Sequence, residues 1–220
     1  MVEWVEPSFD RDKLRSVMAR AEAVLSEKDK AREEAIRLAR DVVRYSGWAV
    51  TAVHKGSLEE ARGHLRRAEE AVGSMRRVLE PHPDLMSSGF ANNAFSEYVE
   101  ARLFIDVITG RGLSSPEELV VPIVPYLQGL GDLVGELRRL ALELVRRGEF
   151  KKAWALLDIM EAIYLELRSL DYPEALLPGV RHKADVARRL VDDTKAMLAD
   201  LESRSHLEAR LKDVLKRLEA

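Results

Sequence analysis

The sequence predicts an all-α protein, organised as one domain over residues 1–220 and built as a bundle of about seven helices. Apolar residues recur at spacings of three and four almost throughout, which is the helical period. Sustained alternation of apolar and polar residues, which would indicate strands, is nearly absent. Charged residues make up 33% of the chain and aromatic residues only 6%, which is typical of helices with solvated faces.

Three helices are expected in the N-terminal half, over residues 10–53, 58–79 and 85–109. Gly47 is a candidate break in the first of them. Ser57 and Glu60 form a capping-box pattern that predicts the start of the second helix. Glycine and proline end each helix, because they favour left-handed caps or cannot continue the helical hydrogen bonds: Gly56, Pro81, Pro83, Gly110 and Gly112.

The C-terminal half is expected to hold helical segments over 116–147, 149–170, 180–202 and 206–218. Ser115 and Pro116, followed by two acidic residues, predict the start of the first segment. Pro122 and Pro125 are expected to interrupt it, after a β-like run that has no partner strand. The short charged segment within 203–220 is a candidate arm for packing or oligomerisation.

Composition excludes several classes of protein. The absence of cysteine excludes a disulfide scaffold, a thiolate metal site and a cysteine nucleophile. Residues 1–12 lack the pattern of a signal peptide, and no stretch reaches the roughly 20 apolar residues of a membrane span, so we expect a soluble cytoplasmic protein. The 35 basic and 38 acidic residues nearly balance, which argues against binding nucleic acid over the whole outer surface.

Two acidic residues lie on an otherwise apolar helical face. Glu97 and Glu100 are three residues apart and share that face, whereas Arg102 and Asp106 point to the opposite side. At about 100° per residue, the same face carries Ala101, Phe104 and Ile108. Buried carboxylates are unfavourable unless a cation offsets them, so the pair is a candidate site for Mg²⁺ or Mn²⁺. An ordinary solvated pair is the alternative.

A second acidic pair, Asp132 and Glu136, shares a face of the next long helix. Polar residues continue that stripe, so a plain solvent-exposed face explains it well: Gln128, Arg139, Glu143 and Arg146.

Basic residues cluster in two places. The first cluster lies along the second helix and comprises Arg62, Arg66, Arg67, Arg76 and Arg77. The second lies near a helix N-terminus, where cations oppose the helix dipole, and comprises Arg181, His182, Lys183, Arg188 and Arg189. An anionic partner such as phosphate is one reason for these clusters, and a solvated face is the other.

Two motifs together resemble the translin superfamily, most closely its translin-associated factor X (Trax) branch. The first is Glu97-Tyr98-Val99-Glu100-Ala101, and the second is the segment YLQGLGDLVGELRR at 126–139. Their order, followed by a basic helix from Lys183, extends the likeness over roughly residues 30–200.

The resemblance implies a helical fold that assembles into a closed homo-oligomer, octamer-like in form. It implies that single-stranded RNA, or single-stranded DNA, binds inside this shell. For the Trax branch it implies a metal-dependent endoribonuclease that uses Mg²⁺ or Mn²⁺. No membrane partner is implied.

Carried over by position, the resemblance makes Glu97, Glu100 and Asp132 catalytic metal ligands, with Glu136 as a further ligand. Members that lack the full acidic set bind nucleic acid without cutting it, and this chain keeps all four. Arg139, Lys183 and Arg188 match basic positions and are expected to bind nucleic acid. The alternatives are a nucleic-acid binder without catalysis and a helical scaffold that binds protein partners.

Overall fold

The computed structural model describes residues 9–218, and in that part of the chain every regular element is a helix. The all-α prediction is confirmed. The eight helices of the described part are α1 (Arg11–His54), α2 (Leu58–Leu79), α3 (Pro83–Met86), α4 (Gly89–Thr109), α5 (Pro116–Leu119), α6 (Ile123–Arg146), α7 (Phe150–Ser169) and α8 (Val180–Leu218). The stretch 1–8, part of the segment read for a signal peptide, lies outside the described residues.

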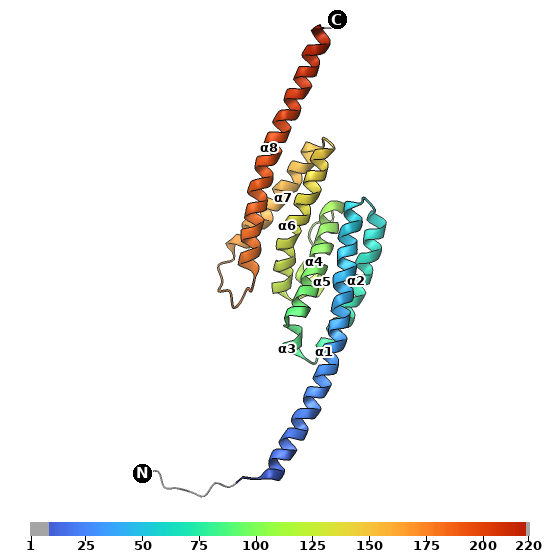
Figure 1. Ribbon diagram of the computed structural model, residues 1–220, viewed down its shortest axis with the longest axis vertical. Coiled ribbons are helices and arrows are strands. Elements are labelled where there is room, and N and C mark those ends of the chain that lie inside the picture. Colours follow the sequence, from blue (N-terminus) through green and yellow to red (C-terminus); the bar gives the residue numbers. More distant parts are fainter. Residues whose placement is uncertain (1–8, 219–220) are drawn as a thin grey trace, which may run out of the picture.

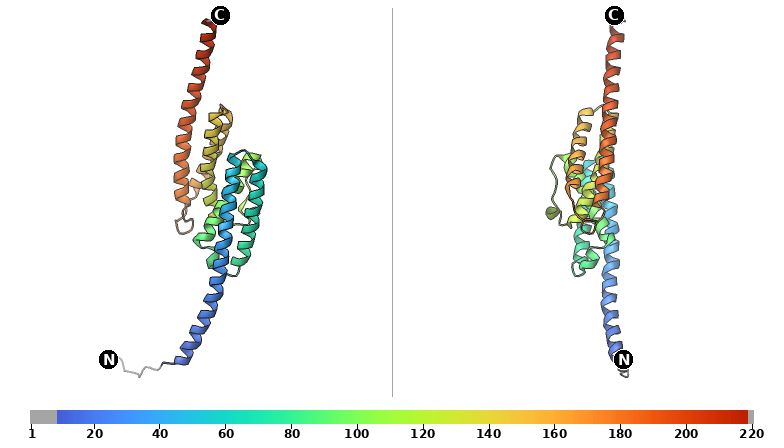
Figure 2. Two further views of the ribbon diagram at one scale, coloured as in Figure 1. Left: turned by 45° about the vertical axis from the view of Figure 1, so that its right-hand side comes forward. Right: turned by 90° about the vertical axis from the view of Figure 1, so that its left-hand side faces the viewer.

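The helices pack side by side in an order that places α4 and α6 at the centre. α1 packs against α2 and α4, α4 against α6, and α6 against both α7 and α8 (Figure 1). The first part of α1 and the last part of α8 project from opposite ends of this body in every view (Figure 2). Half of the largest fully buried side chains come from α4 and α6, among them Tyr98, Phe95, Phe104, Leu133 and Leu137.

The long helix α1 continues through Gly47 without a break, so that candidate break is wrong. Asp10 begins the helix by accepting hydrogen bonds from the backbone N–H groups of Asp12 and Lys13. Its buried residues lie between Ala35 and Val53, while the earlier turns expose their apolar side chains. The helix therefore contributes to the core only along its second half, although Lys28 in the first half pairs with Asp84 of α3.

Ser57 is the N-cap residue of α2, but the capping box predicted there is absent, whereas Ser115, predicted only as a helix start, does form a capping box. The Ser57 backbone N–H donates to the carbonyl of Ala52, which closes the α1–α2 turn. A capping-box glutamate needs that same N–H, so Glu60 has no donor to reach. Ser115, by contrast, exchanges both hydrogen bonds with Glu118.

Two predicted boundaries around α4 and α6 also change. The expected helix 85–109 is split into α3 and α4, with extended backbone at Ser88. Pro122 does interrupt the next segment, and Val120 before it adopts a left-handed conformation with φ 53°. Pro125 does not interrupt it, because it lies in the first turn of α6, where a missing N–H breaks no helical bond.

The predicted break between the last two helices is wrong, because α8 is a single helix that runs without interruption from Val180 to Leu218. The sequence around Ser203 holds no proline or glycine that would end a helix, and Arg204 pairs with Asp200 across the expected break. The role of this terminal segment as an arm stays a prediction.

None of the helices within residues 9–218 combines the length and the apolar character needed to cross a bilayer.

The close approach of α4 and α6 depends on Gly129. A Cβ atom there would lie 2.5 Å from the carbonyl oxygen of Ser96 and 2.9 Å from the side chain of Val99. We expect Gly129→Ala to lower the free energy of unfolding by about 1–3 kcal/mol, because the helices must separate. Gly135→Ala, on the same helix, is the matched control, because a Cβ atom there would have no other atom within 4 Å. This variant is expected to raise the free energy of unfolding by up to about 1 kcal/mol. Thermal denaturation of both variants measures the difference, and equal melting temperatures would contradict the prediction.

Candidate carboxylate site

The two predicted acidic pairs lie together where α4 packs against α6. Glu97 and Glu100 on α4 are half-buried, and the charges of Asp132 and Glu136 on α6 act on both. Burial, followed by the charge of Asp132, raises the pKa of Glu97. The same two causes, in the same order, raise the pKa of Glu100 to about 8. The site therefore holds more negative charge than its surroundings neutralise.

Cationic or hydrogen-bonding partners reach the α6 acids from two further helices. Lys183 Nζ on α8 lies 2.5 Å from Asp132 Oδ1. His54 Nε2, in the last turn of α1, lies 2.5 Å from Glu136 Oε2. The hydrogen bond from His54 is the main cause that lowers the pKa of Glu136. Four helices thus contribute side chains to this carboxylate site.

Glycine also determines how closely Lys183 approaches. A Cβ atom on Gly131 would lie 2.7 Å from the Cβ of Lys183, so only glycine permits α8 this contact with α6. The contact brings the lysine side chain to Asp132, one position further along α6. Gly129 and Gly131 therefore set how closely α6 approaches α4 and α8, and Gly131 thereby brings Lys183 to Asp132.

The donor set fits a hard divalent cation by its chemistry, because all four groups offer carboxylate oxygen. Glu97 and Glu100 make no ion pair with any described residue, which leaves their charge for such a cation to offset. In residues 9–218, however, no three His, Asp or Glu side chains are placed to hold one ion together. Asp132 and Glu136 are instead engaged by Lys183 and His54.

The structure brings together most, but not all, of the predicted site residues. Glu97, Glu100, Asp132, Glu136 and Lys183 meet, and the side chains of Asp132 and Glu136 are partly shielded from solvent, at 31% and 23% exposed. Lys183 faces this acidic site, whereas the resemblance implied a contact with nucleic acid.

The other two predicted basic residues lie further out. Arg139 Nη1 is 3.9 Å from Glu136 and is largely exposed at the rim of the site. Arg188 follows Lys183 by five residues, which turns it about 140° away around α8. It is exposed and lies outside the carboxylate site.

His54 is the site residue that sequence reasoning did not assign. It is 82 positions from Glu136 in the chain, and nothing in the local sequence marks the pair. Its ring packs 5.1 Å from that of Phe104, the apolar neighbour of the acidic pair on α4.

Asp106 was predicted as an ordinary polar residue on the far side of α4, and its side chain is in fact only 2% exposed. Arg102 Nε donates to both of its oxygens, at 3.1 and 3.2 Å. Ser114 adds its hydroxyl at 2.6 Å and its backbone N–H at 3.3 Å. This network fastens the chain after α4 and is separate from the carboxylate site.

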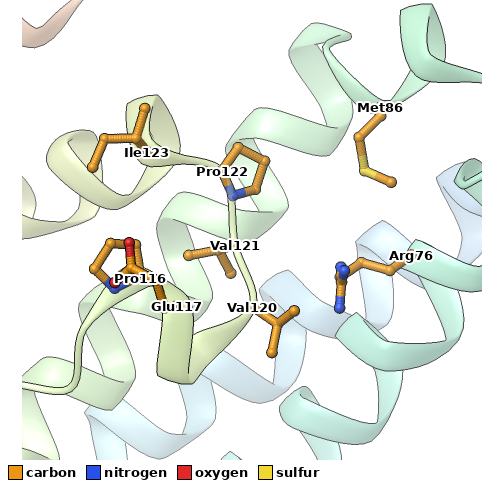
Figure 3. A pocket seen from close by; sticks show the side chains of 8 residues that line it. All are labelled: Arg76, Met86, Pro116, Glu117, Val120, Val121, Pro122 and Ile123. Carbon is orange, nitrogen blue, oxygen red and sulfur yellow. The ribbon is translucent and has the colours of Figure 1, made fainter.

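Two surface pockets lie away from the carboxylates. The one in Figure 3, of about 380 Å³, sits at the α5–α6 junction, and none of the seven predicted residues lines it. The other, of about 400 Å³, lies between α2 and α4 on the side of Asp106 and contains four arginines: Arg62, Arg66, Arg102 and Arg111.

Comparison with known proteins gives consistent matches. The model of the Translin family matches residues 30–201. An uncharacterised protein of Methanocaldococcus jannaschii is 26% identical over 189 residues, which cover 83% of each chain.

Solved structures match over most of their length. A complex of AfC3PO with duplex RNA is 31% identical with a TM-score of 0.79, and the match covers 85% of this chain and 97% of that one. AfC3PO alone is 30% identical with a TM-score of 0.78 and the same coverage. The apo-NeC3PO structure is 20% identical with a TM-score of 0.71. The match covers 89% of this chain and 100% of that one, and it shows that the two share the fold.

Proposed function

The chain belongs to the translin family, and on that premise we propose that it is a metal-dependent endoribonuclease of the Trax type that acts on single-stranded RNA. The observation that carries the proposal is the meeting of four carboxylates from α4 and α6, two of them with raised pKa values. A buried excess of negative charge with oxygen donors is what a Mg²⁺ or Mn²⁺ site requires.

Glu97, Glu100 and Asp132 would hold the metal, with Glu136 as a further ligand. When bound, the metal supplies an activated water and offsets charge on the scissile phosphate. The chain's own groups orient the site. His54 holds Glu136 by its hydrogen bond, and Lys183 holds Asp132. Arg139 is our candidate for contacting a phosphate, because it is exposed at the rim of the site.

We further propose that the protein works as a closed homo-oligomer, octamer-like, that encloses the RNA. The duplex-RNA complex of the similar AfC3PO supports an RNA ligand. An enclosing assembly also explains the balanced net charge of −3, because only an inner surface must attract phosphate. Single-stranded DNA is a further candidate ligand.

The second candidate is an RNA- or DNA-binding protein without catalysis. It is favoured by the arrangement of Asp132 and Glu136, which are engaged by Lys183 and His54 and leave no three ligands around one point in the described residues.

Removal of metal distinguishes the two candidates. We expect the purified protein to cut a labelled single-stranded RNA in Mg²⁺ or Mn²⁺, to lose that activity in excess chelator, and to regain it when metal is restored. Binding of the same RNA is measured in chelator by fluorescence anisotropy, and size by light scattering. Binding without cleavage under all metal conditions would establish the second candidate, and no binding would contradict both.

A further inference from the structure

Three aromatic rings lie together where α1 packs against α2, and one of them, Trp48, is exposed. The rings of Tyr45 and Trp48, on α1, meet edge to face with centroids 5.6 Å apart. The Trp48 ring is 5.3 Å from that of His64 on α2. Trp48 remains 47% exposed, although an indole of this size normally gains from burial. We call these three residues, together with Arg44 and Arg67, the α1–α2 platform.

Two guanidinium groups lie against the rings of the platform. Arg44 is 5.1 Å from the Tyr45 centroid and 5.6 Å from that of Trp48, and Arg67 is 5.8 Å from Tyr45. These are cation–π distances, so the arginines are held beside the aromatic surface. Arg44 also pairs with Asp41 at 2.6 Å, and Glu60 lies 3.6 Å from His64. Arg67 makes no ion pair with any described residue and leaves a positive charge beside the rings.

The platform and the carboxylate site lie on opposite flanks of α1. Tyr45 precedes His54 by nine residues, which places it about 180° around the helix and about 14 Å along it. Trp48 precedes His54 by six residues, about 120° around and about 9 Å along. Between the two flanks, the surface of α1 presents Gly47 and Thr51, followed by Lys55 just after the helix, and none of the three is a carboxylate. An anionic chain can therefore cross from one side to the other without meeting a negative charge on that surface.

We propose that the α1–α2 platform is a stacking site for unpaired bases of single-stranded RNA, an inference that rests on the proposed function. Exposed aromatic faces flanked by arginine bind bases by stacking while the cations hold the adjacent phosphate. Bases within a duplex are already stacked on each other and cannot present a free face. The platform accordingly discriminates between single-stranded and duplex RNA.

The test compares binding of a labelled single-stranded RNA with binding of the same sequence as a blunt duplex, in chelator so that neither is cut. We expect Trp48→Ala to weaken single-strand binding by about 5- to 100-fold, the range of one stacked base. Duplex affinity is expected to stay within about twofold. Trp48→Phe should retain most of the affinity, because it keeps an aromatic face, whereas Trp48→Leu should lose it despite its apolar area.

Tyr172→Ala is the matched control, since Tyr172 is an exposed aromatic residue (59%) on another part of the surface. It should leave both affinities unchanged. Unfolding temperature and particle size are measured for every variant, so that a folding defect is recognised. If Trp48→Ala fails to fold, comparison of Trp48→Phe with Trp48→Leu shows whether binding requires an aromatic ring.

Three results would overturn the inference. They are unchanged single-strand binding by Trp48→Ala, an equal loss for both RNA forms, and a change of particle size that shows the platform to be a protein interface. Each of them leaves tight RNA binding by the unmutated protein intact. Failure of the proposed function is seen separately, as absence of RNA binding or of metal-dependent cleavage in that unmutated protein.

Discussion

Replacing Glu100 by glutamine is expected to lower the rate of metal-dependent RNA cleavage by about 100-fold or more, since a metal ligand supplies several kcal/mol of transition-state stabilisation. Glutamine keeps the volume of the side chain and removes its charge. Asp132→Asn should have a similar effect, because the charge of Asp132 acts more strongly on the two α4 acids than that of any other side chain. Initial rates on single-stranded RNA across a metal titration measure both variants.

Glu100→Gln should also stabilise the metal-free protein at alkaline pH. Burial and neighbouring acids raise the pKa of Glu100 from 4.5 to about 8 in the folded state. Between these values the folded state binds more protons than the unfolded state, so the contribution of this group to stability falls as pH rises from 4.5 to 8. Glu100→Gln removes that loss. Melting curves in chelator should show a higher melting temperature for the variant at pH 8, and little difference near pH 4.5.

Together these measurements separate a catalytic role from a structural one. A fall in activity with a stabilised fold indicates loss of metal binding or chemistry. Glu143→Gln is the matched control and should leave the cleavage rate unchanged, because Glu143 lies about 16 Å further along the same helix than Asp132 and pairs with Arg146 and Arg147 instead. Undiminished cleavage by both Glu100→Gln and Asp132→Asn would contradict the assignment of the site.

Removal of the buried carboxylate of Asp106 should have the largest effect on folding. We expect Asp106→Ala to lower the free energy of unfolding by about 3 kcal/mol, because Arg102 and two groups of Ser114 lose their acceptor. For a chain of this size the melting temperature should fall by about 6–12 °C. Metal-dependent cleavage at a temperature well below the transition should persist, since Asp106 lies on the opposite side of α4 from the carboxylate site.

The controls follow from the geometry of this network. Asp106→Asn keeps one oxygen as an acceptor and should cost less than the alanine variant. Asp12→Ala removes an exposed partner of Arg15, with side chains 91% and 82% exposed, and should leave the melting temperature nearly unchanged. A melting temperature for Asp106→Ala that equals that of the unmutated protein would show that the network contributes nothing to folding.

Much of the fold could be predicted from local patterns. The spacing of apolar residues determines where helices form, and Gly110, Ser115 and Pro122 mark helix boundaries as expected. The errors had two different causes. At Ser57 a local signal was overridden by neighbouring backbone, because its N–H closes the preceding turn and Glu60 cannot complete a capping box. Around Ser203 no local signal opposes a helix, so α8 continues through the expected break.

By itself, the sequence determined the helical class, the shared face of Glu97 and Glu100, and the likeness that led to the translin family. These depend on spacings of three or four residues, over which an α-helix has only one geometry. Only the tertiary structure decided that His54 meets Glu136, that Lys183 meets Asp132, and that Trp48 meets His64. Such partners come from different helices, and their contacts depend on how closely the helices approach. At Gly129 and Gly131 that approach is possible because no Cβ atom stands between α6 and its neighbours.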